Sequence, residues 1–147
     1  MKDALLDTII DEYATVEAFA SLLFYEQKAL AAVSPLELLP PIVEKKSAMA
    51  DKLAMLERNR EAQLSSLGLP AGKRGMDLAA ASDTRLNEHW SALQKSAERA
   101  RRLNADNGLM IRTRMEYNRR ILGVLRGTSE KSTTYGPDGR MPAFGGL

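Results

Sequence analysis

The stretch Leu103–Leu122 reads LNADNGLMIRTRMEYNRRIL, and most of what this sequence predicts depends on it. Leu, Met, Arg, Ala and Glu dominate the stretch and proline is absent, so we expect it to be helical throughout. Asparagines interrupt its apolar stripe at positions where leucine would pack better, namely Asn104, Asn107 and Asn118. Arginines crowd its second half and the residues just after it: Arg112, Arg114, Arg119, Arg120 and Arg126. A long basic helix with polar residues in its own apolar stripe indicates a surface that binds a partner.

The asparagines have two explanations, and the sequence leaves both open. A buried asparagine in a seam between helices can fix the register and the oligomeric state at a cost in stability. Alternatively, the asparagines keep the seam weak enough for a helix of a binding partner to replace an internal contact. The sequence also leaves open whether Gly108 kinks the helix.

Apolar residues at three- and four-residue steps occur outside this stretch as well and predict three long helices. We expect helices at residues 3–33, 41–68 and 84–125, with short helical turns at 36–40 and 77–81. Residues 68–75 contain three glycines and a proline and are expected to form a loop. No β-type alternation occurs, so the predicted fold is all-α: an elongated antiparallel three-helix bundle or hairpin with a flexible C-terminal tail.

The composition fits one helical domain at residues 1–126, followed by a tail at 127–147. The chain has 147 residues, enough for one core, and it contains no cysteine, which excludes disulfides and thiolate chemistry. No apolar run is long enough to span a membrane and no secretion signal is present, so we expect a cytoplasmic protein without membrane insertion. The tail is polar and turn-prone but contains Tyr135, Met141 and Phe144, which is typical of an interaction motif.

Charge is distributed unevenly along the chain, although the net charge is only +2. In residues 1–33, two lysines against six acidic residues give −4, while in residues 98–126 eight arginines against three acidic residues give +5. Opposite charges favour the first and third helices lying side by side. Lys46 and Arg60 interrupt the apolar face of the second helix, and we expect their stems to run along the seam with the charges in water. The carboxylates are likewise expected on solvated faces.

No set of residues in the sequence predicts catalysis, a metal site or a cofactor. The single histidine, His89, has Arg85 one helical turn before it, which does not favour a metal site, and no serine has a plausible His–Asp relay. Trp90 is expected to anchor the core. Gly72-Lys73 lacks the Ser or Thr and the preceding strand of a phosphate-binding loop. Nucleic-acid binding is disfavoured because apolar residues and glutamates interrupt the arginines.

Taken in order, several passages resemble the family of FlgN-type flagellar export chaperones over nearly the whole chain. They are Val43–Ser47 (VEKKS), Glu88–Trp90 (EHW), Leu103–Gly108 (LNADNG), Tyr117–Leu122 (YNRRIL) and Thr134–Arg140 (TYGPDGR). The resemblance implies a cytoplasmic chaperone of the hook–filament junction proteins FlgK and FlgL, which binds their disordered C-terminal regions and delivers them to the type III export apparatus. It also implies that the C-terminal amphipathic helix binds the client.

We therefore predict a client-binding stripe within residues 111–125, formed by Ile111, Met115, Asn118, Ile121, Leu122 and Leu125. The resemblance further implies that Tyr135, with Gly136, Asp138 and Gly139, docks on the cytoplasmic domain of the export-gate protein FlhA. The alternative is a structural coiled-coil adaptor that self-associates through the third helix. Whether the chain forms a homodimer stays open.

Overall fold

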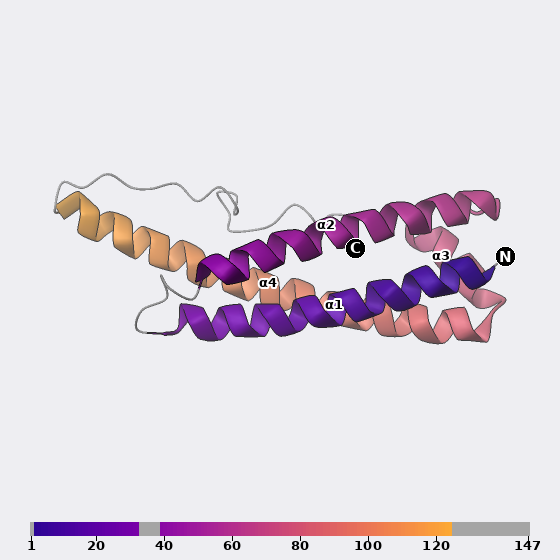
Figure 1. The fold of residues 1–147 in the computed structure, drawn as a ribbon, viewed down its shortest axis with the longest axis horizontal. Helices are drawn as coiled ribbons and strands as arrows, with labels where there is room; N and C mark the ends of the chain where they lie inside the picture. The colour runs from indigo at the N-terminus through magenta and orange to yellow at the C-terminus, as the bar shows by residue number, and fades with distance from the viewer. Residues whose placement is uncertain (1, 33–38, 125–147) are drawn as a thin grey trace.

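The computed structural model describes residues 2–32 and 39–124, and these form an elongated bundle of helices (Figure 1). The helices are α1 (Lys2–Leu30), α2 (Leu39–Ser66), α3 (Gly72–Ala81) and α4 (Thr84–Val124). The all-α prediction is confirmed for the described residues. The three expected long helices are present, and the short helical turn predicted at 77–81 is the second half of a longer helix, α3. The predicted tail at 127–147 and most of the predicted turn at 36–40 lie outside the described residues.

Helix α1 packs against both α2 and α4, and its contacts fix the direction of each neighbour (Figure 1). Ion pairs join Glu12 to Arg60 and Glu26 to Lys46, so α2 runs antiparallel to α1. Toward α4, the contacts are between Asp3 and Arg85, Glu17 and Arg99, and Ala32 and Arg114. Each of these pairs is 82 residues apart, so α1 and α4 run parallel in one register along the whole length of α1.

The core follows the apolar stripes that the sequence predicts. Its members on α1 and α4 include Leu5, Ile9, Val16, Phe19, Leu23, Leu86, Trp90, Leu93, Ala97 and Ala100. Helix α2 contributes Leu53 and Leu64, and α3 contributes Met76. The prediction that Trp90 anchors the core is confirmed, and so is the expectation that the acidic first helix lies beside the basic last one.

The prediction of a loop across residues 68–75 is wrong for its second half, because α3 begins at Gly72. Gly72 has a φ of +75°, and its N–H donates to both carboxylate oxygens of Glu61, at 3.1 and 3.0 Å. Gly75 lies so close to the backbone that a Cβ there would come within 1.7 Å of the Pro70 carbonyl oxygen. Gly72 thus begins a helix and Gly75 permits a close backbone contact. In the sequence, glycines with these two roles look the same as glycines in a loop.

Helix α4 begins at Thr84, where the sequence predicts the third long helix to begin. The Asp83 carboxylate accepts a hydrogen bond from the backbone N–H of Arg85 at 3.0 Å and thereby caps the helix. The helix passes through the buried Gly108 without interruption. None of the helices in residues 2–32 and 39–124 is both long enough and apolar enough to cross a bilayer.

Candidate partner-binding site

The last ten described residues of α4, 115–124, extend past the ends of α1 and α2 (Figure 1). The Arg114 guanidinium donates to the Ala32 carbonyl at 3.1 Å, so Arg114 lies at the level where α1 ends. The antiparallel pairing of α2 with α1 places Leu39, the first residue of α2, near the same level. We call residues 115–124 the overhang. At a rise of ~1.5 Å per residue it is about 15 Å long.

The stripe of α4 that packs on α1 continues along the overhang. Steps of three and four residues connect its buried members, Leu93, Ala97, Ala100, Asn104, Asn107 and Ile111. The same steps lead on to Met115, Asn118 and Leu122, where the first and last are half-buried and Asn118 is exposed. The overhang therefore presents the surface that upstream forms the core, at a level that α1 and α2 do not reach.

Of the predicted client residues, the structure brings Met115, Asn118, Ile121 and Leu122 together on the overhang, and Ile111 lies buried where the stripe leaves α1. Leu125 and the predicted gate-docking residues Tyr135, Gly136, Asp138 and Gly139 lie outside the described residues. Beside the stripe, Tyr117, Ile121 and Val124 are 62%, 41% and 83% exposed. Tyr117 and Val124 were not predicted as client residues, although their four- and three-residue steps from Ile121 are visible in the sequence.

The opposite side of the overhang is basic. Arg119 and Arg120 are exposed, as is Arg112 just before the overhang. The Glu116 carboxylate lies 3.6 Å from Arg120, an exposed pair one turn apart that contributes little. The overhang is thus an amphipathic helix with a wide apolar side and an arginine rim, a combination suited to a partner helix that has apolar and acidic residues.

A buried polar network lies in the body of the bundle. The Lys46 ammonium contacts both carboxylate oxygens of Glu26, at 3.0 and 3.2 Å, and both side chains are fully buried. The Asn107 amide donates to the same carboxylate at 3.0 Å and to the Leu23 carbonyl at 2.7 Å. Burial lowers the pKa of Lys46, and the neighbouring Glu26 opposes this shift. The network joins α1, α2 and α4. For Asn107, these contacts favour the explanation in which a buried asparagine fixes the register between helices.

Further along the bundle, Arg60 and Glu12 form a second buried pair, with 3.2 Å between Nε and Oε1. The Arg60 guanidinium lies 5.2 Å from the Trp90 ring, whose N–H donates to Asp77 at 3.1 Å. Neither Glu12 oxygen has a hydrogen-bond donor among the described residues. Burial therefore raises the pKa of Glu12 to about 7, with Arg60 opposing the rise and Glu57 and Glu61 adding to it.

Two predictions about charged residues are thus wrong. Lys46 and Arg60 do not extend to water but lie 0% and 3% exposed, and Glu12 and Glu26 are not on solvated faces. The cause is the antiparallel register of α1 and α2, which places a carboxylate opposite each buried cation. Among residues 2–32 and 39–124, no three histidine or acidic side chains gather as a metal site requires.

Comparison with known proteins assigns the chain to a family. The family model "FlgN protein" matches residues 1–143. The "Flagella synthesis protein FlgN" of Yersinia enterocolitica is 30% identical over 98 residues, which are 67% of this chain and 61% of that protein. The protein of the same name from Y. enterocolitica serotype O:8 / biotype 1B gives the same values. The match thus spans about three fifths of the length of these curated relatives, and no solved structure matches.

Proposed function

The chain belongs to the FlgN family of flagellar chaperones, and from this premise we propose that it binds the C-terminal regions of the hook–filament junction proteins FlgK and FlgL on the overhang. The single observation that supports this site is the stripe of α4, which fills the core as far as Ile111 and then continues beyond α1. A client helix placed there would extend the packing that α1 provides upstream.

The physical properties of such a site suit a chaperone that must release its client. A disordered client segment that folds on binding loses conformational entropy at that moment, which keeps the affinity moderate for the area buried. The wide apolar side of the overhang supplies the attraction, and the arginine rim selects a segment with acidic flanks. Catalysis has no part in this function.

Substitution on the overhang tests the client site. Ile121→Gln combined with Leu122→Gln should weaken capture of FlgK and FlgL at least a hundredfold, because each apolar side chain contributes about 1.5–3 kcal/mol when buried. Met55→Gln combined with Leu78→Gln is the matched control, since Met55 and Leu78 are 45% and 48% exposed on α2 and α3. Co-purification measures capture, and circular dichroism checks that both variants stay helical. Retention of both clients by the overhang variant would refute the site.

The second part of the proposal is delivery of the client to the export gate. It rests on the resemblance of the tail passage Thr134–Arg140 to the FlgN family. Tyr135, with Gly136, Asp138 and Gly139, docks on the cytoplasmic domain of FlhA. Tyr135→Ala should then keep client capture and lose FlhA binding in a pull-down. If Tyr135→Ala loses clients and retains FlhA, the two roles are assigned to the wrong segments.

Light scattering of the client-free protein separates the chaperone from a self-associating adaptor. A chaperone whose overhang awaits a client should form a defined complex when the client segment is added. A stable oligomer that the client segment leaves unchanged would favour the adaptor.

A further inference from the structure

The apolar side of the overhang is wider than one neighbouring helix covers. At about 100° per residue, this side runs from Val124 to Met115 and spans about 180° of the helix circumference. An amphipathic helix packs on a neighbour through an apolar stripe roughly 100° wide. The polar residues of the overhang and its glycine lie on the other half, apart from Asn118: Glu116, Arg119, Arg120 and Gly123. The overhang therefore has space for two neighbouring helices.

Two stripes share the apolar side. Met115, Asn118 and Leu122 continue the stripe that packs on α1, and a second stripe lies beside it. Steps of three, four and seven residues connect the members of this second stripe, which also extends upstream of the overhang. We call it the edge stripe, and it consists of Leu103, Met110, Tyr117, Ile121 and Val124. It is about 32 Å long.

The upstream part of the edge stripe runs along the border between α4 and α1. Arg99 donates to Glu17 of α1 at 2.6 Å, so this side of α4 borders α1. Leu103 and Met110 follow Arg99 by four and eleven residues, lie on the same border and are half-buried. On α1, Phe24 follows Glu17 by seven residues and lies on the facing border.

Phe24 enlarges this surface from the side of α1. The Asn107 amide donates to the neighbouring Leu23 carbonyl, so Phe24 lies at the level of the upstream part of the edge stripe. The Phe24 side chain is 50% exposed, and the Lys28 ammonium lies 4.8 Å from the centre of its ring. Burying an exposed aromatic ring of this size against a partner would be favourable.

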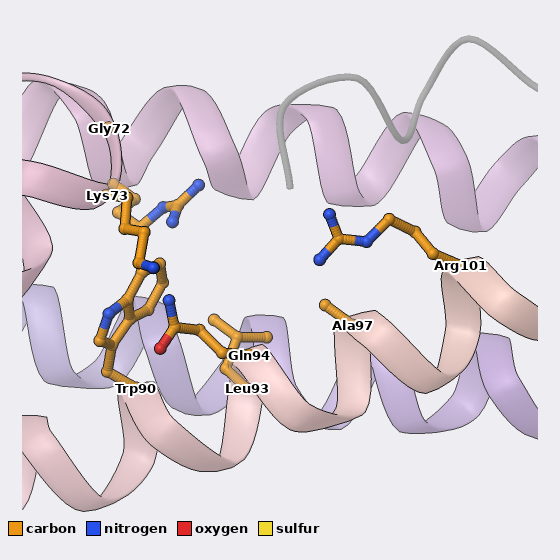
Figure 2. A pocket seen from close by; sticks show the side chains of 8 residues that line it. Gly72, Lys73, Trp90, Leu93, Gln94, Ala97 and Arg101 are labelled. Atoms are coloured by element: carbon orange, nitrogen blue, oxygen red, sulfur yellow. The ribbon is translucent and has the colours of Figure 1, made fainter.

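The opposite side of α4 already faces other helices of the bundle. There α4 lies against α3, and a cavity of about 260 Å³ between α2, α3 and α4 is lined by Trp90 and Ala97, among others (Figure 2). Met110 is turned about 140° around the helix from Ala97. A partner that follows the edge stripe therefore approaches from the side of Phe24, away from α2 and α3.

The charges beside the edge stripe indicate the chemistry of this partner. Toward α1, the stripe is bordered by Lys28 and by Arg114, which donates to the Ala32 carbonyl. On the outer border, Asp106 and Arg120 are both exposed and have opposite charges. The border toward α1 therefore selects, and it favours acidic residues on the partner because complementary charges orient a bound segment.

We propose that the edge stripe and Phe24 bind a second amphipathic helix of the client, next to the helix that continues the path of α1. That the helix belongs to the client rests on the proposed function. It has apolar residues at three- and four-residue steps and acidic residues toward Lys28 and Arg114. A helix of about 21 residues spans the stripe from Leu103 to Val124. The client then packs on α4 through two helices.

Single cysteines measure whether the client covers this surface, because the chain contains no cysteine. Full-length Phe24→Cys and Tyr25→Cys are labelled with a maleimide, alone and in the purified complex with the C-terminal region of FlgK. The complex should slow the labelling of Phe24→Cys by roughly tenfold or more, since burial excludes the reagent, and that of Tyr25→Cys by less than about twofold. Tyr25 is the matched control, an adjacent aromatic residue that is 67% exposed and turned about 100° away.

Three labelling results would overturn the proposal. The first is a rate for Phe24→Cys that the complex leaves unchanged, and the second is equal protection of Phe24→Cys and Tyr25→Cys. The third is slow labelling of client-free Phe24→Cys that becomes faster on dilution, which would identify a second copy of this chain as the occupant of the edge stripe.

Capture of clients by further variants separates this inference from the proposed function. Phe24→Gln combined with Met110→Gln should weaken capture of FlgK and FlgL roughly tenfold or more, because apolar contacts are lost. Tyr25→Gln combined with Leu109→Gln is the matched control, since Leu109 is the exposed neighbour of Met110, and it should retain capture. Circular dichroism checks that both variants stay helical.

The Phe24 and Met110 variant leaves the overhang unchanged, so the two proposals can fail separately. Full capture by this variant, with loss of clients from the variant of Ile121 and Leu122, would overturn the second helix and keep the overhang site. The reverse result would refute the overhang site and keep the surface formed by Phe24 and Met110.

Discussion

The buried pair of Glu12 and Arg60 predicts an unusual dependence of the protein's stability on pH. Glu12 is fully buried, lacks a hydrogen-bond donor among the described residues, and has a pKa raised by burial from 4.5 to about 7. A raised pKa means that the folded protein binds the proton more tightly than the unfolded chain does. Stability from this group is therefore fully present below pH 4.5 and is lost as the pH rises through about 7.

The size of the effect follows from the two pKa values. A tenfold change in proton affinity is worth about 1.4 kcal/mol, so the full shift corresponds to about 3 kcal/mol. Most of this loss falls between pH 5 and pH 8, where the contribution of Glu12 should decline by about 2 to 3 kcal/mol. Glu12→Gln removes the titrating group and should remove this slope, although it also leaves Arg60 without its carboxylate.

Urea denaturation at half-unit steps from pH 5 to pH 8, followed by circular dichroism, measures the slope. The informative quantity is the difference in slope between the unchanged protein and Glu12→Gln, which cancels the titration of all other groups. Asp11→Asn is the matched control, because Asp11 is exposed on the same helix, and it should keep the original slope. Parallel profiles for Glu12→Gln and the unchanged protein would refute the assignment of a raised pKa to Glu12.

Two further predictions concern packing. Lys46→Met removes the cation beside a buried carboxylate and should cost about 3–5 kcal/mol in the free energy of unfolding, most of which Glu26→Gln should restore in the double variant. An equal loss in the single and double variants would show that the charge of Glu26 is not the cause. Gly75→Ala should destabilise by about 1–3 kcal/mol or more, since its Cβ meets the Pro70 carbonyl, whereas Gly123→Ala, which meets nothing within 4 Å, should not. Thermal melting compares the two glycine variants, and equal melting temperatures would contradict the close packing at Gly75.

The helices could be predicted from sequence because their apolar residues repeat at helical steps. The burial of Lys46 and Arg60 could not be predicted in the same way. A long basic side chain in a seam can extend to water or pair inside, and the choice depends on a carboxylate on another helix. The start of α3 could not be predicted for a similar reason. Gly72 begins the helix and Gly75 permits a close backbone contact, but glycine in a sequence usually indicates a loop.

For the overhang as well, some features could be predicted from neighbouring residues, whereas others depend on contacts between distant parts of the chain. The stripe of Met115, Asn118, Ile121 and Leu122 could be predicted from spacing alone, whereas the point at which α1 ends along α4 could not. That point depends on the register between α1 and α4. The contact of Arg114 with Ala32, two residues that are 82 positions apart in the sequence, shows this register. The cavity beside Trp90 was missed entirely, because its lining comes from α2, α3 and α4 at once.

The overhang also has a consequence for the order in which binding and helix formation occur. A separate ten-residue peptide with this sequence would hardly be helical in water, because the first turn of a helix is costly to nucleate. In the intact protein, the part of α4 that packs on α1 is already helical, so the overhang only has to extend an existing helix. Because the overhang does not pack in the core, substitutions there should have little effect on the stability of the bundle. Recognition of the partner can therefore change through evolution while that stability stays constant.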